Sequence, residues 1–293
     1  MHKVRYNALH LFLELSPRGP LLVKSGGISA DPALPDMQFV RTYQPERGES
    51  PYLPGSSLKG VVRGFVEKVL RTLDERSTWR WACATFDDGS CGKKWAASEV
   101  PSYQIYRESC GACRLFGHTR LRGRTSFTDF LPVGEVRTET RYGVAISRLS
   151  QAVAQGPFEM EVAVAGTFAG QLVLENFELW QLALLALSLE SMQRGLLKIG
   201  YGKNRGFGEV SVAVQEARLD EVAQGLLADV WRGLGGFVDQ SACSDYGLWE
   251  PHRLQGLPQA VASENLGLYI RRIYDGEQWR AATAKLLEAV SAV

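Results

Sequence analysis

The sequence predicts an α+β fold in which helices lie on one face of a β-sheet. Residues 4–15 alternate between apolar and other side chains, which is typical of a half-buried strand. Two segments, 57–73 and 177–193, carry apolar residues at helical spacing. Strand signals lie between these helices and after the second one. The order strand, loop, helix, strands, helix, strand is compatible with a ferredoxin-like split βαβ sheet.

The remaining elements follow in chain order from local composition. Residues 16–54 are rich in Pro, Gly and Ser, which predicts a long functional loop around a short extended segment. Further strands are predicted at 38–43, 125–130, 159–168, 170–174 and 209–214, and further helices at 219–233 and 277–291.

These elements divide the chain into a core and an extension. The predicted ferredoxin-like core covers residues 1–214, with an insertion at 74–124. Residues 215–293 are predicted to form a helical C-terminal extension.

Composition and charge limit the possible partners. The 293 residues are 45% hydrophobic, enough for a sizeable core, and the net charge is only +1. Residues 1–213 carry 26 basic and 21 acidic side chains (+5), and the rest carry 7 and 11 (−4). No apolar run reaches the roughly 18 residues of a membrane span, and the first residues do not resemble a secretion signal. We therefore expect no membrane partner and a cytoplasmic location.

The segment YLPGSSLKGVVR at residues 52–63 predicts a helix N-terminus that can bind a phosphate. Its Pro-Gly turn leads into Ser56 and Ser57, either of which can cap the first turn. Lys59 and Arg63 place cations beside the free N–H groups of that turn. An ordinary capped helix without a ligand is the alternative.

A glycine-rich loop, KIGYGKNRGFGEV at residues 198–210, is the second candidate for anion binding. Its glycines let backbone amides approach a phosphate chain closely. Its end follows the ribonucleoprotein consensus, except that Glu209 and Val212 stand where that consensus has aromatics. A glycine-rich hairpin without a ligand is the alternative. The candidate residues of this loop are Gly202, Lys203, Asn204 and Arg205.

Four of the five cysteines lie in one window and predict a structural zinc site. Cys110 and Cys113 form a Cys-x-x-Cys turn, and Cys83 and Cys91 precede it. Four thiolates satisfy tetrahedral Zn²⁺, although His118 could replace one of them. Buried structural cysteines or a redox pair are the alternatives.

Three segments taken in order, YLPGSSLKGVVRG, CRLFGHTRLRGRTSFTDF and KIGYGKNRGFGEV, resemble the RAMP superfamily of CRISPR-associated proteins. More narrowly, residues 5–214 resemble the backbone subunits of type III effector complexes. The resemblance implies the ferredoxin-like fold and a role in antiviral defence. It also implies a subunit that binds guide crRNA in a filament of neighbouring RAMP subunits and cleaves complementary target RNA.

The same resemblance nominates a catalytic residue. In that family an aspartate precedes an extended segment that leads to the proline-glycine-serine-serine motif, and here that position is Asp36, with Asp31 as second choice. Cleavage would use Mg²⁺ or a similar divalent ion, with the aspartate as base or metal ligand. A scaffold that binds crRNA without cleaving is the alternative, and a guide-processing endonuclease that uses His10 is a weaker one.

Four further arginines are candidates for RNA contact. Residues 114–124 hold an arginine-rich run. Residues 141–148 resemble the family's thumb, a protruding hairpin that wedges between bases, and the resemblance implies such a hairpin at 132–168. A solvated face is the alternative for both segments. The candidates are Arg122, Arg124, Arg141 and Arg148.

Overall fold

The computed structural model describes residues 3–26, 34–95 and 99–291 and has a mixed α+β fold. A seven-stranded sheet with antiparallel pairing has the strand order β12-β13-β9-β1-β8-β6, and β7 also pairs with β8. The predicted α+β class is confirmed. The strands are β1 (Asn7–Pro17), β6 (Thr125–Phe127), β7 (Leu131–Ile146), β8 (Val153–Glu175), β9 (Val210–Val222), β12 (Ala262–Asn265) and β13 (Tyr269–Tyr274).

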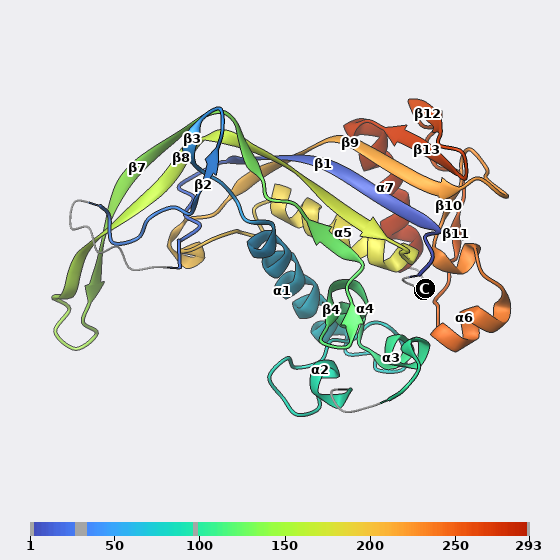
Figure 1. Cartoon of the computed structure of the whole chain (residues 1–293). Coiled ribbons are helices and arrows are strands. Elements are labelled where there is room, and N and C mark those ends of the chain that lie inside the picture. The colour runs from blue at the N-terminus through green and yellow to red at the C-terminus, as the bar shows by residue number, and fades with distance from the viewer. Residues whose placement is uncertain (1–2, 27–33, 96–98, 292–293) are drawn as a thin grey trace.

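Three long helices cover one face of this sheet (Figure 1). They are α1 (Gly55–Leu73), α5 (Leu179–Gln193) and α7 (Gly276–Ser291). The alternation in β1 explains the arrangement, because its leucines from Leu9 to Leu15 are buried while the residues between them are partly exposed. Helix α1 buries one stripe that includes Leu58, Val62 and Val66, whereas α5 is buried on nearly all sides.

The insertion forms a small lobe of short elements below α1 (Figure 1). Glu178, buried just before α5, joins this lobe to the core by accepting a hydrogen bond from the Tyr106 hydroxyl. Its other oxygen accepts the backbone N–H of Trp249 in the C-terminal extension. Burial raises the pKa of Tyr106, which keeps its hydroxyl a donor. The elements are α2 (Cys91–Lys94), α3 (Ser102–Glu108), α4 (Gly111–Phe116), β4 (Gly117–His118) and β5 (Leu121–Arg122).

The C-terminal extension is only partly helical, which corrects the prediction. The helix expected at 277–291 is present as α7, but the one expected at 219–233 is absent, because β9 continues to Val222 and pairs with both β1 and β13. The carboxylate of Glu221, fully buried, holds Arg232 and Arg272 and joins the extension to the sheet. The other elements here are β10 (Trp231–Arg232), η2 (Leu234–Gly236), α6 (Gln240–Tyr246) and β11 (Arg253–Leu254).

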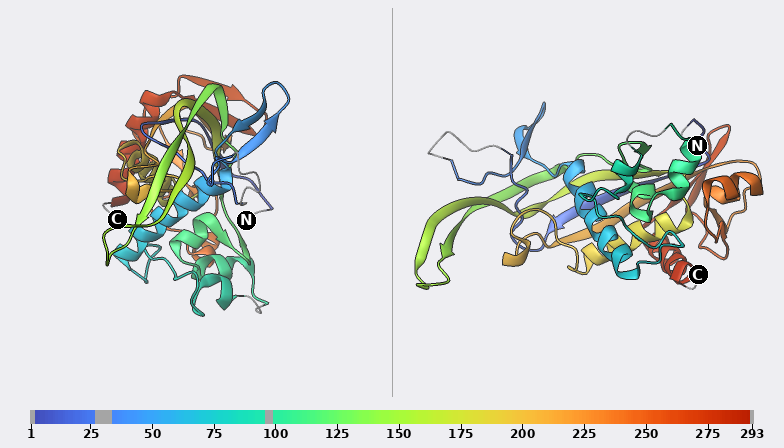
Figure 2. Two further views of the ribbon diagram at one scale, coloured as in Figure 1. Left: turned by 90° about the vertical axis from the view of Figure 1, so that its left-hand side faces the viewer. Right: turned by 90° about the horizontal axis from the view of Figure 1, so that it is seen from below.

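Strands β7 and β8 form a hairpin that extends beyond the rest of the sheet (Figure 2). The two strands predicted at 159–168 and 170–174 are one strand of 23 residues. Apolar side chains are exposed near the hairpin tip, where Leu149 is 100% and Tyr142 69% exposed. A smaller hairpin of β2 (Arg41–Gln44) and β3 (Gly48–Pro51) lies beside its base. In the described residues, no helix combines the length and the apolar character that crossing a membrane requires.

Candidate nucleic-acid interface and metal centre

A cleft of about 710 Å³ brings together the two segments that the sequence nominated for phosphate binding. Helix α1 lines it with Ser57 and Lys68, and the glycine-rich loop lines it with Lys203. Lys24 contributes a further cation from the N-terminal loop. No acidic side chain lines this cleft among the described residues. The cleft is therefore cationic and can accept an anionic chain.

The tip of α1 differs from the prediction. The helix begins at Gly55 after Pro54, and neither Ser56 nor Ser57 caps it. Instead the carboxylate of Asp129 accepts the Gly55 N–H at 2.8 Å. The carboxylate thus complements the positive end of the helix and occupies the Gly55 N–H. The two serines remain exposed on the first turn, and Ser57 faces the cleft.

The glycine-rich loop depends on its glycines for its shape. Gly200, Gly202, Gly206 and Gly208 all have positive φ. A Cβ on Gly208 would lie 2.0 Å from the Ile199 carbonyl oxygen. The resulting turn exposes Lys203, Asn204 and Arg205. The Lys203 amine is nevertheless partly desolvated at the cleft wall, and this desolvation, followed by the like charge of Lys68, lowers its pKa, so a bound anion would stabilise the Lys203 charge.

Backbone pairing connects the cleft with Asp36. The Tyr201 N–H of the glycine-rich loop donates to the Leu22 carbonyl at 2.7 Å. The segment after Leu22 pairs in turn with the segment after Asp36, where the Val40 N–H donates to the Val23 carbonyl at 2.9 Å. The two nominated regions, the glycine-rich loop and the Asp36 segment, are thus linked through one intervening segment.

Asp36 itself lies beside the outer half of the β7–β8 hairpin, where Glu159 pairs with Tyr142. It is exposed, and its Oδ2 accepts the Glu159 N–H at 2.9 Å. The next residue, Met37, pairs with both Glu159 and Glu161 of β8. Among the described residues, no group of three metal-ligating side chains includes Asp36. Asp31 lies outside the described residues.

The nominated arginines have different surroundings. Arg122 is exposed and lies 3.8 Å from Glu175, and Arg141 and Arg148 are exposed on the hairpin. Arg124 is 4% exposed, donates to the Asn176 carbonyl and stacks on the Tyr106 ring. We therefore assign Arg124 a structural role and omit it from the proposed RNA contacts.

Sequence reasoning missed four residues that line the cleft. Gly60 and Gly64 lie inside α1, and a Cβ on either would meet nothing within 4 Å. Glycine inside a helix costs about 1 kcal/mol relative to alanine, so packing does not explain these two. Their four-residue spacing places both glycines on one face of α1, so the sequence already indicated a flat helix surface that a ligand can approach. Lys24 and Lys68 gave no such signal.

The four predicted cysteines form one buried cluster whose Sγ atoms all lie within 4.8 Å of one another. The Cys83 and Cys113 sulfurs are 3.8 Å apart. Two sulfur ligands of a tetrahedral zinc ion, each bonded at about 2.3 Å, lie at about the same distance from one another. The Cys113 N–H donates to the Cys110 sulfur and the Cys110 N–H to the Cys91 sulfur, both at 3.4 Å. All five cysteines of the chain are free of disulfides. The cluster can hold a metal ion such as zinc.

The four thiols of the cluster are coupled to one another. Hydrogen bonds with the other cysteines lower the pKa of Cys83 and Cys91, whereas the pKa of Cys110 and Cys113 is raised. The guanidinium of Arg63 lies 3.8 Å from the Cys113 sulfur and also donates to Glu67 and to the Gly117 carbonyl. Arg63 therefore turns toward the insertion. His118 is not part of the cluster and instead contacts the Ser109 hydroxyl at 3.1 Å.

A family model decides the relationship of the chain. The model of the RAMP superfamily matches residues 14–211, from β1 to the start of β9 and well over half of the chain. The chain belongs to the RAMP superfamily. This membership supports a CRISPR-associated, RNA-binding role and assembly with other Cas subunits. No curated protein matches the chain.

Proposed function

We propose that this RAMP protein is a backbone subunit of a type III CRISPR ribonucleoprotein that binds guide crRNA and cleaves complementary target RNA. The cleft between α1 and the glycine-rich loop carries the proposal. Among the residues that the structure describes, its lining holds Lys24, Lys68 and Lys203 and no acidic side chain, which suits the phosphates of a guide strand, and its glycines let the strand come close. Sequence recognition of the target would then come from base pairing.

The candidate for cleavage is Asp36. The Glu159 N–H donates to Oδ2 of Asp36 and fixes the carboxylate. Oδ1 is then the oxygen that can contact RNA or a metal ion. A single carboxylate suits Mg²⁺ only when RNA phosphates and water supply the other ligands. In that position the carboxylate can take the proton of an RNA 2′-hydroxyl or hold the ion. The exposed apolar hairpin tip around Leu149 is suited to separate stacked bases.

Zinc is the metal that we propose for the cysteine cluster, with a structural role. Four sulfur ligands leave no open coordination position on the metal. The buried cluster also joins the insertion to α1, because Arg63 of α1 contacts the Cys113 sulfur. The expected neighbours are further RAMP subunits arranged along the guide.

Two alternatives differ from this proposal in a measurable way. A crRNA-binding scaffold would use the same cleft without cleaving. A guide-processing endonuclease would need a histidine that RNA can reach, but the His10 side chain is only 22% exposed, contacts Gln171 at 3.0 Å and lies 3.9 Å from Asp220 within an ion-pair cluster. Burial also lowers the pKa of His10. These contacts favour a structural role for His10.

The test is cleavage of a labelled, guide-complementary RNA by the assembled complex, with magnesium or chelator. We expect evenly spaced cuts for the wild type, and binding without cuts for Asp36→Ala. Glu159→Ala is a matched control, because its backbone N–H still holds Asp36. Tight binding by the wild type without any cleavage would contradict the catalytic role and leave the scaffold.

A further inference from the structure

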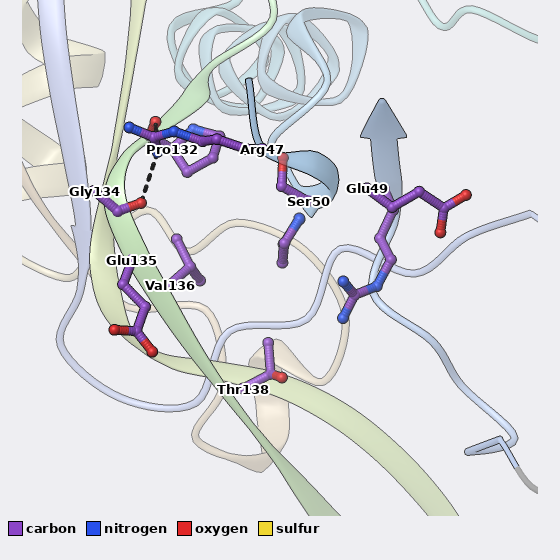
Figure 3. A pocket seen from close by; sticks show the side chains of 10 residues that line it. Arg47, Glu49, Ser50, Pro132, Gly134, Glu135, Val136 and Thr138 are labelled. Carbon is purple, nitrogen blue, oxygen red and sulfur yellow. Dashed lines mark hydrogen bonds between the residues drawn. The ribbon is translucent and has the colours of Figure 1, made fainter. Parts of the chain in front are cut away.

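A small pocket lies apart from the cleft, between the β2–β3 hairpin and the base of β7 (Figure 3). Its volume is about 280 Å³, equal to roughly nine water molecules at about 30 Å³ each. Figure 3 shows Ser50, Val136 and Thr138 around the same hollow. This volume exceeds what an ion needs and is close to the lower limit for small-molecule sites.

The charges that line this pocket balance. Arg41 and Arg47 contribute two cations, and Glu49 and Glu135 contribute two carboxylates. The lining therefore differs from that of the cationic cleft and does not favour a phosphate. A neutral ligand with both hydrogen-bond donors and acceptors matches it better.

Two polar groups of the pocket are placed for such a ligand. The Ser50 hydroxyl oxygen is buried and has no hydrogen-bond partner among the described residues. Arg47 is held by the carbonyls of Pro132 and Gly134 at 2.9 and 2.7 Å, which fixes its planar guanidinium at the wall (Figure 3). A buried hydroxyl without a partner is costly, so a ligand that pairs with it gains affinity.

The pocket is also connected to the Asp36 segment. Arg41 lines it and pairs with Glu161 of β8. The other oxygen of Glu161 accepts the Phe39 N–H at 3.0 Å, three residues after Asp36. A ligand in the pocket would therefore lie beside the segment that positions Asp36 and beside the base of the hairpin.

We propose that this pocket receives one unpaired nucleobase of the bound RNA. A nucleobase is the neutral part of a nucleotide, with flat apolar faces and an edge of donors and acceptors, and RNA-binding proteins read such unstacked bases. Val136 and the neighbouring prolines offer apolar walls, while Ser50 and Thr138 contribute hydroxyl groups to the lining. This inference rests on the proposed RNA binding but not on cleavage.

The test uses single-stranded RNAs with one 2-aminopurine, a fluorescent purine whose emission rises when it leaves the stack, moved along the strand. We expect emission to rise at one position with the full-length wild type. Thr138→Trp, which fills the pocket, should abolish the rise and weaken binding about tenfold. Ala262→Trp, which adds a tryptophan to the exposed edge strand β12, is the control, and Ser50→Ala should reduce the rise without filling the pocket.

Each outcome decides one of the two proposals. The pocket proposal would be overturned if RNA binds and the emission rise is the same in the wild type and in Thr138→Trp, or if no 2-aminopurine position brightens. Either result would leave the proposed function standing. Absence of RNA binding by the wild type would refute the proposed function and the pocket together.

Discussion

Removal of the three lysines of the cleft should change the salt dependence of RNA binding by a calculable amount. The perturbation is Lys24→Gln, Lys68→Gln and Lys203→Gln in one chain. Each phosphate that a lysine neutralises contributes about 0.7 to the slope of log affinity against log salt for a single strand, so three contribute about 2. Between 50 and 200 mM salt, the wild type should therefore lose roughly 20-fold more affinity than the variant.

The assay is fluorescence anisotropy of a labelled single-stranded RNA at four or more salt concentrations. The matched control removes the same three charges elsewhere, at Lys93, Lys94 and Lys285. In the structure these lysines contact Asp88, Glu108 and the Gly256 carbonyl and do not line the cleft. Equal slopes for the cleft variant and the wild type, or an equal decrease in the control, would refute the reasoning.

The same binding should depend on pH in a defined direction. Burial, followed by the charge of Lys68, lowers the pKa of Lys203 from 10.5. The cation is the form that binds phosphate, so affinity should fall as pH rises through this lowered pKa, starting below 10.5. Lys68→Gln removes the like charge and should move the fall to higher pH.

Three further predictions concern stability and metal content. Asp129→Ala removes the acceptor of the Gly55 N–H and should cost about 1–2 kcal/mol in urea unfolding, whereas Asp129→Asn keeps an acceptor and should cost less; equal costs would contradict a contribution from the hydrogen bond. Gly208→Ala, whose Cβ meets the Ile199 oxygen at 2.0 Å, should lower the melting temperature more than Gly206→Ala, which has similar φ but open space. His118→Ala should keep about one zinc per chain by atomic absorption and Cys91→Ser should lose it; metal loss in the histidine variant would place His118 among the ligands.

Local patterns in the sequence were sufficient for much of the core. The alternation before residue 16 and the helical stripe after Gly55 each depend on neighbours within a few residues, so β1 and α1 could be predicted. The cysteine cluster could be predicted as well, because Cys110-x-x-Cys113 fixes half of a tetrahedral site within one turn. The glycine-rich loop was evident because only glycine tolerates its repeated positive φ.

Long-range contacts decided the rest. Strand β9 continues to Val222 because it pairs with both β1 and β13. The spacing of apolar residues within 219–233 contains no information about those distant partners. Arg124 was predicted at the surface, but its position over the Tyr106 ring arises only when the insertion folds against α5. Asp129 became the partner of the α1 tip because β6 delivers it there across 74 residues of chain.

The sequence by itself therefore determined the chemistry that is available: a glycine-rich loop with cations, four thiols, an amphipathic helix after a Pro-Gly turn and an aspartate on a loop. The tertiary structure decided which of these groups meet. It placed Lys24 and Lys68 beside Lys203, turned Arg63 toward the cysteines and connected the Asp36 segment to the cleft through backbone pairing. The physical reason is that side-chain type and short-range period are local properties, whereas charge clusters and pockets form only where distant segments pack together.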